Sequence, residues 1–125
     1  MNNELITICT ATYNRSNLLP VLYNSLITQT NTNFEWVIVD DGSTDNTESW
    51  VQEIQKKASF NIRYYKQVNK GKHIAINKGI QKAKGNCFFI VDSDDRLPER
   101  SLEIIKFKFA TIKTNTNVAG IVGLK

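Results

Sequence analysis

The sequence predicts an α/β fold with a mostly parallel sheet of alternating strands and helices. Short apolar runs alternate with longer amphipathic segments along the chain, and polar loops rich in aspartate follow several of the apolar runs. Strands that alternate with helices form parallel βαβ units, in which helices cover both faces of the sheet. The 125 residues contain no internal repeat and no linker, so we expect them to form one domain.

Two strands and two helices are predicted in the first half of the chain. Residues 5–10 and 34–39 are short β-rich runs, typical of strands in a parallel sheet. Ser16 is expected to cap the first helix, and Pro20 is tolerated in its first turn. A turn over residues 40–45, rich in side chains that bond their own backbone, precedes the second helix. The positions predicted to face the core follow helical spacing: Leu18, Leu22 and Leu26, then Thr47, Val51, Ile54 and Ala58.

The second half is predicted to repeat this pattern. Residues 61–67 alternate and are less apolar than the other strands, which favours a place near the sheet edge. A helix over residues 72–84 leads to a fourth strand over residues 86–91, and Pro98 opens a last long helix in its first turn. The tail at 118–124 is either a fifth strand or a frayed end. The helix positions expected to face the core are Ile76, Ile80 and Ala83, followed by Leu102, Ile105, Phe109 and Ile112.

The composition is that of a soluble globular protein and excludes several kinds of site. Hydrophobic residues make up 41% of the chain and charged residues 22%, and no segment approaches the roughly 20 apolar residues of a membrane span. The N-terminus lacks the features of a signal peptide, so we expect a cytoplasmic location, with the inner face of the membrane as an alternative. Cys9 and Cys87 are expected to be buried hydrophobes, and the single histidine, His73, excludes a His-rich zinc site.

Three carboxylates follow the apolar run at 87–91. Asp92, Asp94 and Asp95 lie within four residues, directly after a predicted strand, where open α/β sheets bind their ligands. Like charges this close repel each other. A divalent cation compensates them well, because Mg²⁺ and Mn²⁺ favour hard oxygen ligands and are commonly shared with substrate phosphates. The cluster therefore predicts a site for Mn²⁺ or Mg²⁺ and a diphosphate.

Three loops are expected to meet at one edge of the sheet. Residues 11–15, 40–45 and 92–96 each follow the carboxyl end of a strand, and these ends lie along one edge of a doubly wound sheet. Each loop alone is also explained as a turn or a helix cap. The sequence matches neither an EF-hand nor a P-loop nor a dinucleotide fingerprint. The lysines at 70–84 fit a solvated helix face or attraction to a polyanion, and without an accompanying aromatic set we expect no nucleic-acid binding.

Four segments carry a resemblance to a known family. Residues 7–15 (TICTATYNR), 35–45 (EWVIVDDGSTD), 69–79 (NKGKHIAINKG) and 89–95 (FIVDSDD) resemble, in their order and spacing, the family 2 glycosyltransferases of the GT-A fold. The resemblance covers residues 5 to about 110. It implies that the predicted sheet is the Rossmann-like nucleotide-binding half of a GT-A fold.

The resemblance also implies a donor site for a nucleotide-diphosphate sugar. In such a site the first loop cradles base and ribose, the aspartate turn hydrogen-bonds the base, and a basic residue lies near the nucleotide. An Asp-x-Asp element holds Mn²⁺ or Mg²⁺ against the diphosphate. The implied nucleotide-binding residues are Thr10, Ala11, Tyr13, Arg15, Asp40, Asp41, Lys72, Asp92 and Ser93, and the implied metal ligands are Asp92, Asp94 and Asp95.

The implied activity is a metal-dependent sugar transfer to a glycan or lipid-linked acceptor, with inversion, in glycan or cell-envelope polysaccharide synthesis. No Asp or Glu follows Glu103, so no residue matches the family's general base, which we expect beyond Lys125. Residues 1–125 are therefore interpreted as a donor-binding domain truncated before the acceptor half. The alternative is a nucleotide-sugar-binding module without catalysis of its own. Peripheral membrane association and a homodimer stay open.

Overall fold

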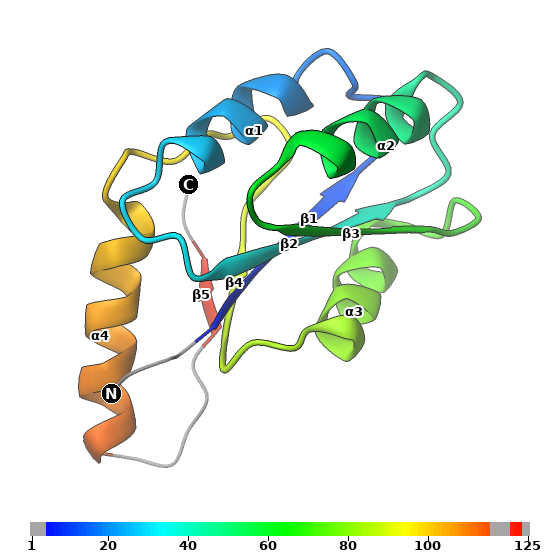
Figure 1. The fold of residues 1–125 in the computed structure, drawn as a ribbon. Helices are drawn as coiled ribbons and strands as arrows, with labels where there is room; N and C mark the ends of the chain where they lie inside the picture. Colours follow the sequence, from blue (N-terminus) through cyan, green and yellow to red (C-terminus); the bar gives the residue numbers. More distant parts are fainter. Residues whose placement is uncertain (1–4, 116–120, 124–125) are drawn as a thin grey trace.

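The computed structural model describes residues 5–115 and 121–123 and confirms the predicted α/β fold. Within these residues, five parallel strands form one sheet in the order β3-β2-β1-β4-β5 (Figure 1). The elements follow one another as β1 (Ile6–Thr12), α1 (Leu19–Ile27), β2 (Phe34–Asp40), α2 (Thr47–Lys57), β3 (Asn61–Lys66), α3 (Lys72–Lys82), β4 (Cys87–Ile90), α4 (Ser101–Asn115) and β5 (Ile121–Gly123).

The helices cover the sheet unequally. α1, α2 and α4 lie over one face, and α3 lies over the other (Figure 1). The larger core joins leucines of α1 and α4 to Trp36 and Phe89 of the sheet, whereas the α3 side holds a small cluster of Val37, Val39 and Ala75. All seven residues of β2 are buried, because this strand has a neighbour on each side and helices on each face. Cys9 and Cys87 are buried as predicted.

The first strand and helix differ from their predicted bounds. β1 continues through Thr12, so Ala11 belongs to the strand and the loop begins later than predicted. The prediction that Ser16 caps α1 is wrong: the helix begins at Leu19, and the backbone N–H of Ser16 instead donates to Asp45, 3.2 Å away. The same Asp45 carboxylate accepts the backbone N–H and the hydroxyl of Thr47, the first residue of α2, and so joins Ser16 to the start of that helix.

The inward face of α3 is also different from the prediction. Ala75 and Gly79 are its buried residues, while Ile80 is 43% exposed. The helix lies so close to β1 that a Cβ atom at position 79 would be 2.2 Å from the sulfur of Cys9. Small side chains permit this approach of α3 to β1 and larger ones do not. Apolar character alone therefore predicted the wrong face of α3, that of Ile76 and Ile80 instead of that of Ala75 and Gly79.

The remaining elements agree with the sequence in outline. β3 is at the edge of the sheet, as predicted. The last helix begins at Ser101 rather than at Pro98, whose carbonyl accepts a bond from the Ser101 N–H at 3.0 Å. Leu102 and Ile105 are buried as expected, and part of the predicted tail strand forms β5. The side chains of Phe109 and Ile112, and the rest of the tail, lie outside the described residues. Among the helices of the described part, none is both long and apolar enough to cross a membrane.

We predict that Gly79→Ala destabilises the protein. Alanine favours a helix interior by up to about 1 kcal/mol relative to glycine. Overpacking against Cys9 should cost about 1–3 kcal/mol, so the net free energy of unfolding should fall in urea denaturation.

Cys9→Ala provides the matched background, because the Cβ atom at position 79 would then meet only ordinary contacts at 3.6 and 3.7 Å. There, Gly79→Ala should be neutral or stabilising. Equal effects of Gly79→Ala in both backgrounds would contradict the proposed close contact.

Candidate functional site

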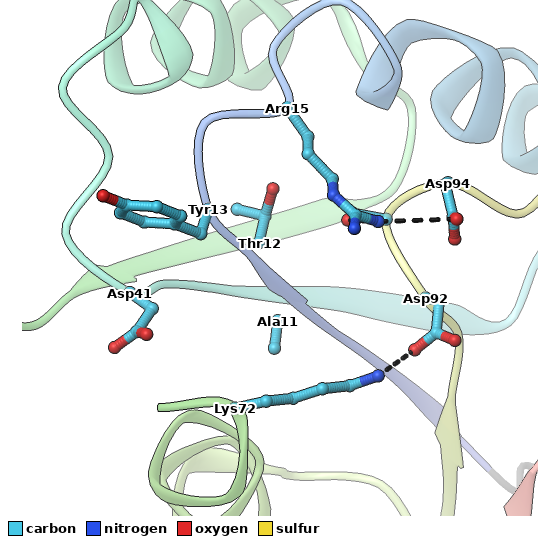
Figure 2. A pocket seen from close by; sticks show the side chains of 9 residues that line it. Ala11, Thr12, Tyr13, Arg15, Asp41, Lys72, Asp92 and Asp94 are labelled. Atoms are coloured by element: carbon cyan, nitrogen blue, oxygen red, sulfur yellow. Dashed lines mark hydrogen bonds and ion pairs between the residues drawn. The ribbon is translucent and has the colours of Figure 1, made fainter. Parts of the chain in front are cut away.

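A cleft of about 330 Å³ opens at the carboxyl ends of β1, β2 and β4. All three loops that were expected to meet contribute to it, and the first turn of α3 forms a further wall (Figure 2). Its lining residues are Ala11, Thr12, Tyr13, Arg15, Asp41, Lys72, Asp92, Ser93 and Asp94. The convergence follows from parallel strand order, because loops after parallel strands leave the sheet along the same edge.

Asn14 holds the first loop against the second. It has a positive φ of 52°, which asparagine tolerates better than most residues. Its side-chain oxygen accepts the backbone N–H groups of Thr44 at 2.8 Å and Asp45 at 3.3 Å, and its own N–H donates to the Ser43 hydroxyl at 2.8 Å. The flanking Tyr13 and Arg15 are thereby presented to the cleft. The sequence prediction missed Asn14, although its preference for turns was a usable signal.

Asp41 forms one end of the cleft and is held by the loop before α3. Its Oδ1 accepts bonds from the Gln67 amide at 2.8 Å and from the N–H groups of Lys70 at 2.8 Å and Gly71 at 3.3 Å, and its Oδ2 accepts the Gly71 N–H at 3.0 Å. Burial pushes the pKa of Asp41 upward, but the bonds from Gln67, Lys70 and Gly71 outweigh it and hold the pKa below its usual value. The carboxylate is therefore ionised at neutral pH.

Two predicted nucleotide contacts, Thr10 and Asp40, do not line the cleft. Thr10 is fully buried and accepts a bond from the Trp36 indole N–H at 3.0 Å. Asp40 is fully buried too: it accepts the Ser43 N–H at 2.9 Å and the Tyr64 hydroxyl, and burial together with this bond raises the pKa of Tyr64. Successive side chains of a strand point to opposite faces of the sheet. Thr10 therefore faces Trp36 in the larger core, whereas the adjacent Ala11 reaches the cleft.

The sequence prediction also missed Thr12, which lines the cleft as the last residue of β1. Its hydroxyl is buried and has no hydrogen-bond partner among the described residues. Its backbone carbonyl accepts the Asp41 N–H at 2.8 Å and joins the two loops at their roots. Thr12 lies within residues 11–15, which were expected at this edge of the sheet, but as the last residue of β1 and not in a loop.

The other end of the cleft is acidic. Asp92, Asp94 and Asp95 each offer an oxygen within 4.8 Å of the others, and Asp92 and Asp94 line the cleft while Asp95 does not. Two cations meet this cluster from across the cleft (Figure 2). Lys72 Nζ lies 2.6 Å from Asp92 Oδ1, and Arg15 lies 3.5 Å from Asp94 Oδ2 and 3.4 Å from the Ser93 hydroxyl. Three carboxylates against two cations leave a net negative charge, and three oxygens at this spacing fit a small divalent cation.

Comparison with known proteins agrees with this geometry. Residues 7–123 match the model of the family described as glycosyl transferase family 2. The chain belongs to this family. The resemblance seen in the sequence is thus confirmed over nearly the whole chain.

Individual relatives and solved structures extend the comparison. An uncharacterized glycosyltransferase of Nostoc sp. is 33% identical over 117 residues, which are 94% of this chain and 35% of that protein. S. aureus TarS in complex with UDP matches with a TM-score of 0.78 and 30% identity, over 85% of this chain and 32% of that chain. The mannosyltransferase PcManGT from Pyrobaculum calidifontis, in complex with GDP-Man and Mn²⁺, matches with a TM-score of 0.74 and 26% identity, over 81% and 31% of the two chains. The chain thus spans about a third of the length of these relatives.

We predict that Asp41→Asn destabilises the protein at neutral pH and that the difference shrinks in acid. Because the folded pKa of Asp41 lies below the ordinary value of 3.8, its ionised form stabilises the fold above about pH 4. That contribution is lost as the pH falls through the folded pKa. Urea denaturation of both proteins between pH 6 and pH 3 measures it, and Asp45, whose pKa is also lowered, is common to both. A difference that stays constant over this range would contradict the assignment.

Proposed function

We propose that this chain is the donor-binding part of a metal-dependent family 2 glycosyltransferase. It would bind a nucleotide-diphosphate sugar and present the sugar to a glycan or lipid-linked acceptor, with inversion, in polysaccharide synthesis. The observation that carries the proposal is the cleft with two chemically different ends. One end carries the rigid carboxylate of Asp41 beside Tyr13, and the other carries the acidic cluster with its two cations.

The two ends suit the two halves of a nucleotide diphosphate. Tyr13 is 47% exposed at the rim and offers a ring against which a base can pack. Arg15 and Lys72 bring positive charge to the middle of the cleft and to its acidic end. Lys72 is also the first residue of α3, where the helix dipole attracts anions. We therefore assign base recognition to Tyr13 and Asp41 and diphosphate binding to Arg15 and Lys72.

The acidic cluster fits Mn²⁺ or Mg²⁺. The donor set is made of carboxylate oxygens alone, which these hard cations prefer, and a site of two or three carboxylates leaves room for phosphate oxygens. We propose that Asp92, Asp94 and Asp95 hold the cation. When bound, it supplies Lewis-acid stabilisation of the charge on the departing nucleoside diphosphate. The Mn²⁺ in the complex of the mannosyltransferase relative supports this assignment.

The bonds to Asp41 favour uracil over guanine. A carboxylate oxygen accepts about two hydrogen bonds, and Oδ1 already receives three donors, so only Oδ2 has capacity left for a base. Uracil presents one ring N–H between two carbonyls. Guanine presents a ring N–H and an amino group side by side and would need both oxygens. We propose a uridine nucleotide, in keeping with the UDP complex of TarS.

We predict that UDP binding depends on Mn²⁺ and on the acidic cluster. Asp92→Ala and Asp94→Ala should each weaken Mn²⁺-dependent UDP binding at least about tenfold in calorimetric titration, because even outer-shell changes commonly cost that much. Both aspartates are partly exposed, so the fold should persist by circular dichroism. Glu99→Ala, an exposed carboxylate just after the cluster, is the matched control and should bind as the parent does. Failure of the folded parent to bind either UDP or GDP with Mn²⁺ would refute the proposed function.

We predict that UDP binds about five- to 150-fold tighter than GDP, since one well-formed base contact discriminates by about 1–3 kcal/mol. Gln67→Ala leaves Asp41 Oδ1 with the Lys70 N–H at 2.8 Å and with the Gly71 N–H, whose bond at 3.3 Å is longer and is shared with Oδ2. Oδ1 is then partly free for a base, and the gap between the two nucleotides should narrow. Gln52→Ala makes the same chemical change on the exposed side of α2 and should leave the gap unchanged. Tighter binding of GDP than of UDP by the parent protein would contradict the assignment of the base.

A further inference from the structure

We propose that Lys72 competes with the divalent cation for Asp92, so that cation and nucleotide diphosphate bind cooperatively by an exchange of partners. Asp92 exchanges its ion pair with Lys72 for a bond to the cation, and Lys72 exchanges the same ion pair for one with the diphosphate. The inference rests on the proposed function and adds how its two ligands depend on each other.

The contact between the two residues sets up the competition. Lys72 begins α3 and Asp92 follows β4, and the lysine side chain crosses the cleft to place Nζ 2.6 Å from Asp92 Oδ1 (Figure 2). Asp92 is also a member of the three-carboxylate cluster. An ammonium group at hydrogen-bond distance from an oxygen occupies the space that a cation on that oxygen needs, and it repels the cation. A cation that takes Oδ1 of Asp92 as a ligand therefore displaces Lys72, and a cation on Oδ2 is repelled by the neighbouring ammonium group.

The exposure of the pair makes the exchange reversible. The side chains of Lys72 and Asp92 are 62% and 41% exposed, and pairs this exposed are weak, so displacing the lysine reduces cation affinity only about fivefold. The second pair, Arg15 with Asp94, is longer at 3.5 Å and also exposed, so it competes less. A buried pair would instead have held Asp92 permanently, because separating buried charges costs far more.

A diphosphate removes the cost of displacement. It gives the ammonium of Lys72 a new anionic partner at the positive end of α3, and it adds oxygens to the cation on Asp92. Each ligand thus makes the site better for the other. Because coupling of two equilibria is reciprocal, the factor by which UDP raises Mn²⁺ affinity equals the factor by which Mn²⁺ raises UDP affinity.

The test measures binding of each probe separately in the whole chain. Free Mn²⁺ is followed by electron paramagnetic resonance, and UDP by calorimetry, in the parent protein and in Lys72→Gln, Lys72→Arg and Lys78→Gln. Lys72→Gln should bind Mn²⁺ alone about fivefold tighter than the parent and UDP alone more weakly, and the coupling factor should fall. Lys72→Arg keeps the positive charge but not the ammonium geometry, so its Mn²⁺ affinity and coupling factor should lie closer to those of the parent than those of Lys72→Gln do. Lys78→Gln makes the same charge change elsewhere on α3 and should also match the parent.

Three outcomes overturn the exchange. The first is a Mn²⁺ affinity of Lys72→Gln that equals or lies below that of the parent. The second is a coupling factor of Lys72→Gln that equals that of the parent. The third is a rise in Mn²⁺ affinity in Lys78→Gln as large as that in Lys72→Gln, which would reveal a general charge effect. In each case Mn²⁺-dependent binding of UDP by the parent still supports the proposed function. Absence of Mn²⁺-dependent binding of both UDP and GDP in the parent refutes the exchange and the proposed function together.

Discussion

The position of α3 on the sheet is the constraint on which the cleft depends, and two carboxylates at the two ends of β2 fix it. Asp41, just after β2, binds the N–H groups of Lys70 and Gly71 before the helix. Glu35, near the start of β2, binds the N–H of Lys84 after the helix, at 2.8 Å. Gly79 lets the middle of the helix approach β1. With both ends and the middle held, the first residue of α3 is directed across the cleft.

The hydrogen bonds to Asp41 and Glu35 also explain why these carboxylates tolerate buried positions. Glu35 is almost fully buried, yet it accepts the guanidinium of Arg63 at 2.9 Å and the hydroxyl of Thr7 at 2.6 Å in addition to the backbone N–H. A buried charge is strongly unfavourable unless it is paired and hydrogen-bonded, and this one is both.

Close to the strand ends, Gly42 has a φ of +88° and a Cβ there would be 3.0 Å from the backbone of Asn69, so the turn at Asp41 requires glycine.

The carboxylates of this protein therefore fall into two groups with different physical roles. Glu35, Asp40 and Asp41 are buried and bound by donors on fixed elements, and they hold loops and helices in place. Asp92 and Asp94 are more exposed and meet the ends of long, flexible cations. Fixed partners give rigidity, and mobile partners allow exchange. The cleft therefore has one carboxylate held by fixed donors at one end and carboxylates paired with exposed side chains at the other, and the proposed binding of a nucleotide diphosphate with a cation rests on this difference.

The sequence by itself determined the fold class, the order of the elements and the loops that meet at the cleft. Apolar periodicity and parallel topology are enough for that. The predicted site residues that line the cleft are Ala11, Tyr13, Arg15, Asp41, Lys72, Asp92, Ser93 and Asp94. Only the tertiary structure decided which neighbour along a strand faces the cleft: Thr10 and Asp40 point into the protein because side chains alternate, and periodicity does not give the phase at a strand end. It also decided the inward face of α3, since a close approach selects for small residues rather than for apolar ones. The pairing of Lys72 with Asp92, 20 residues apart, depends on where that helix lies, and no local pattern encodes it.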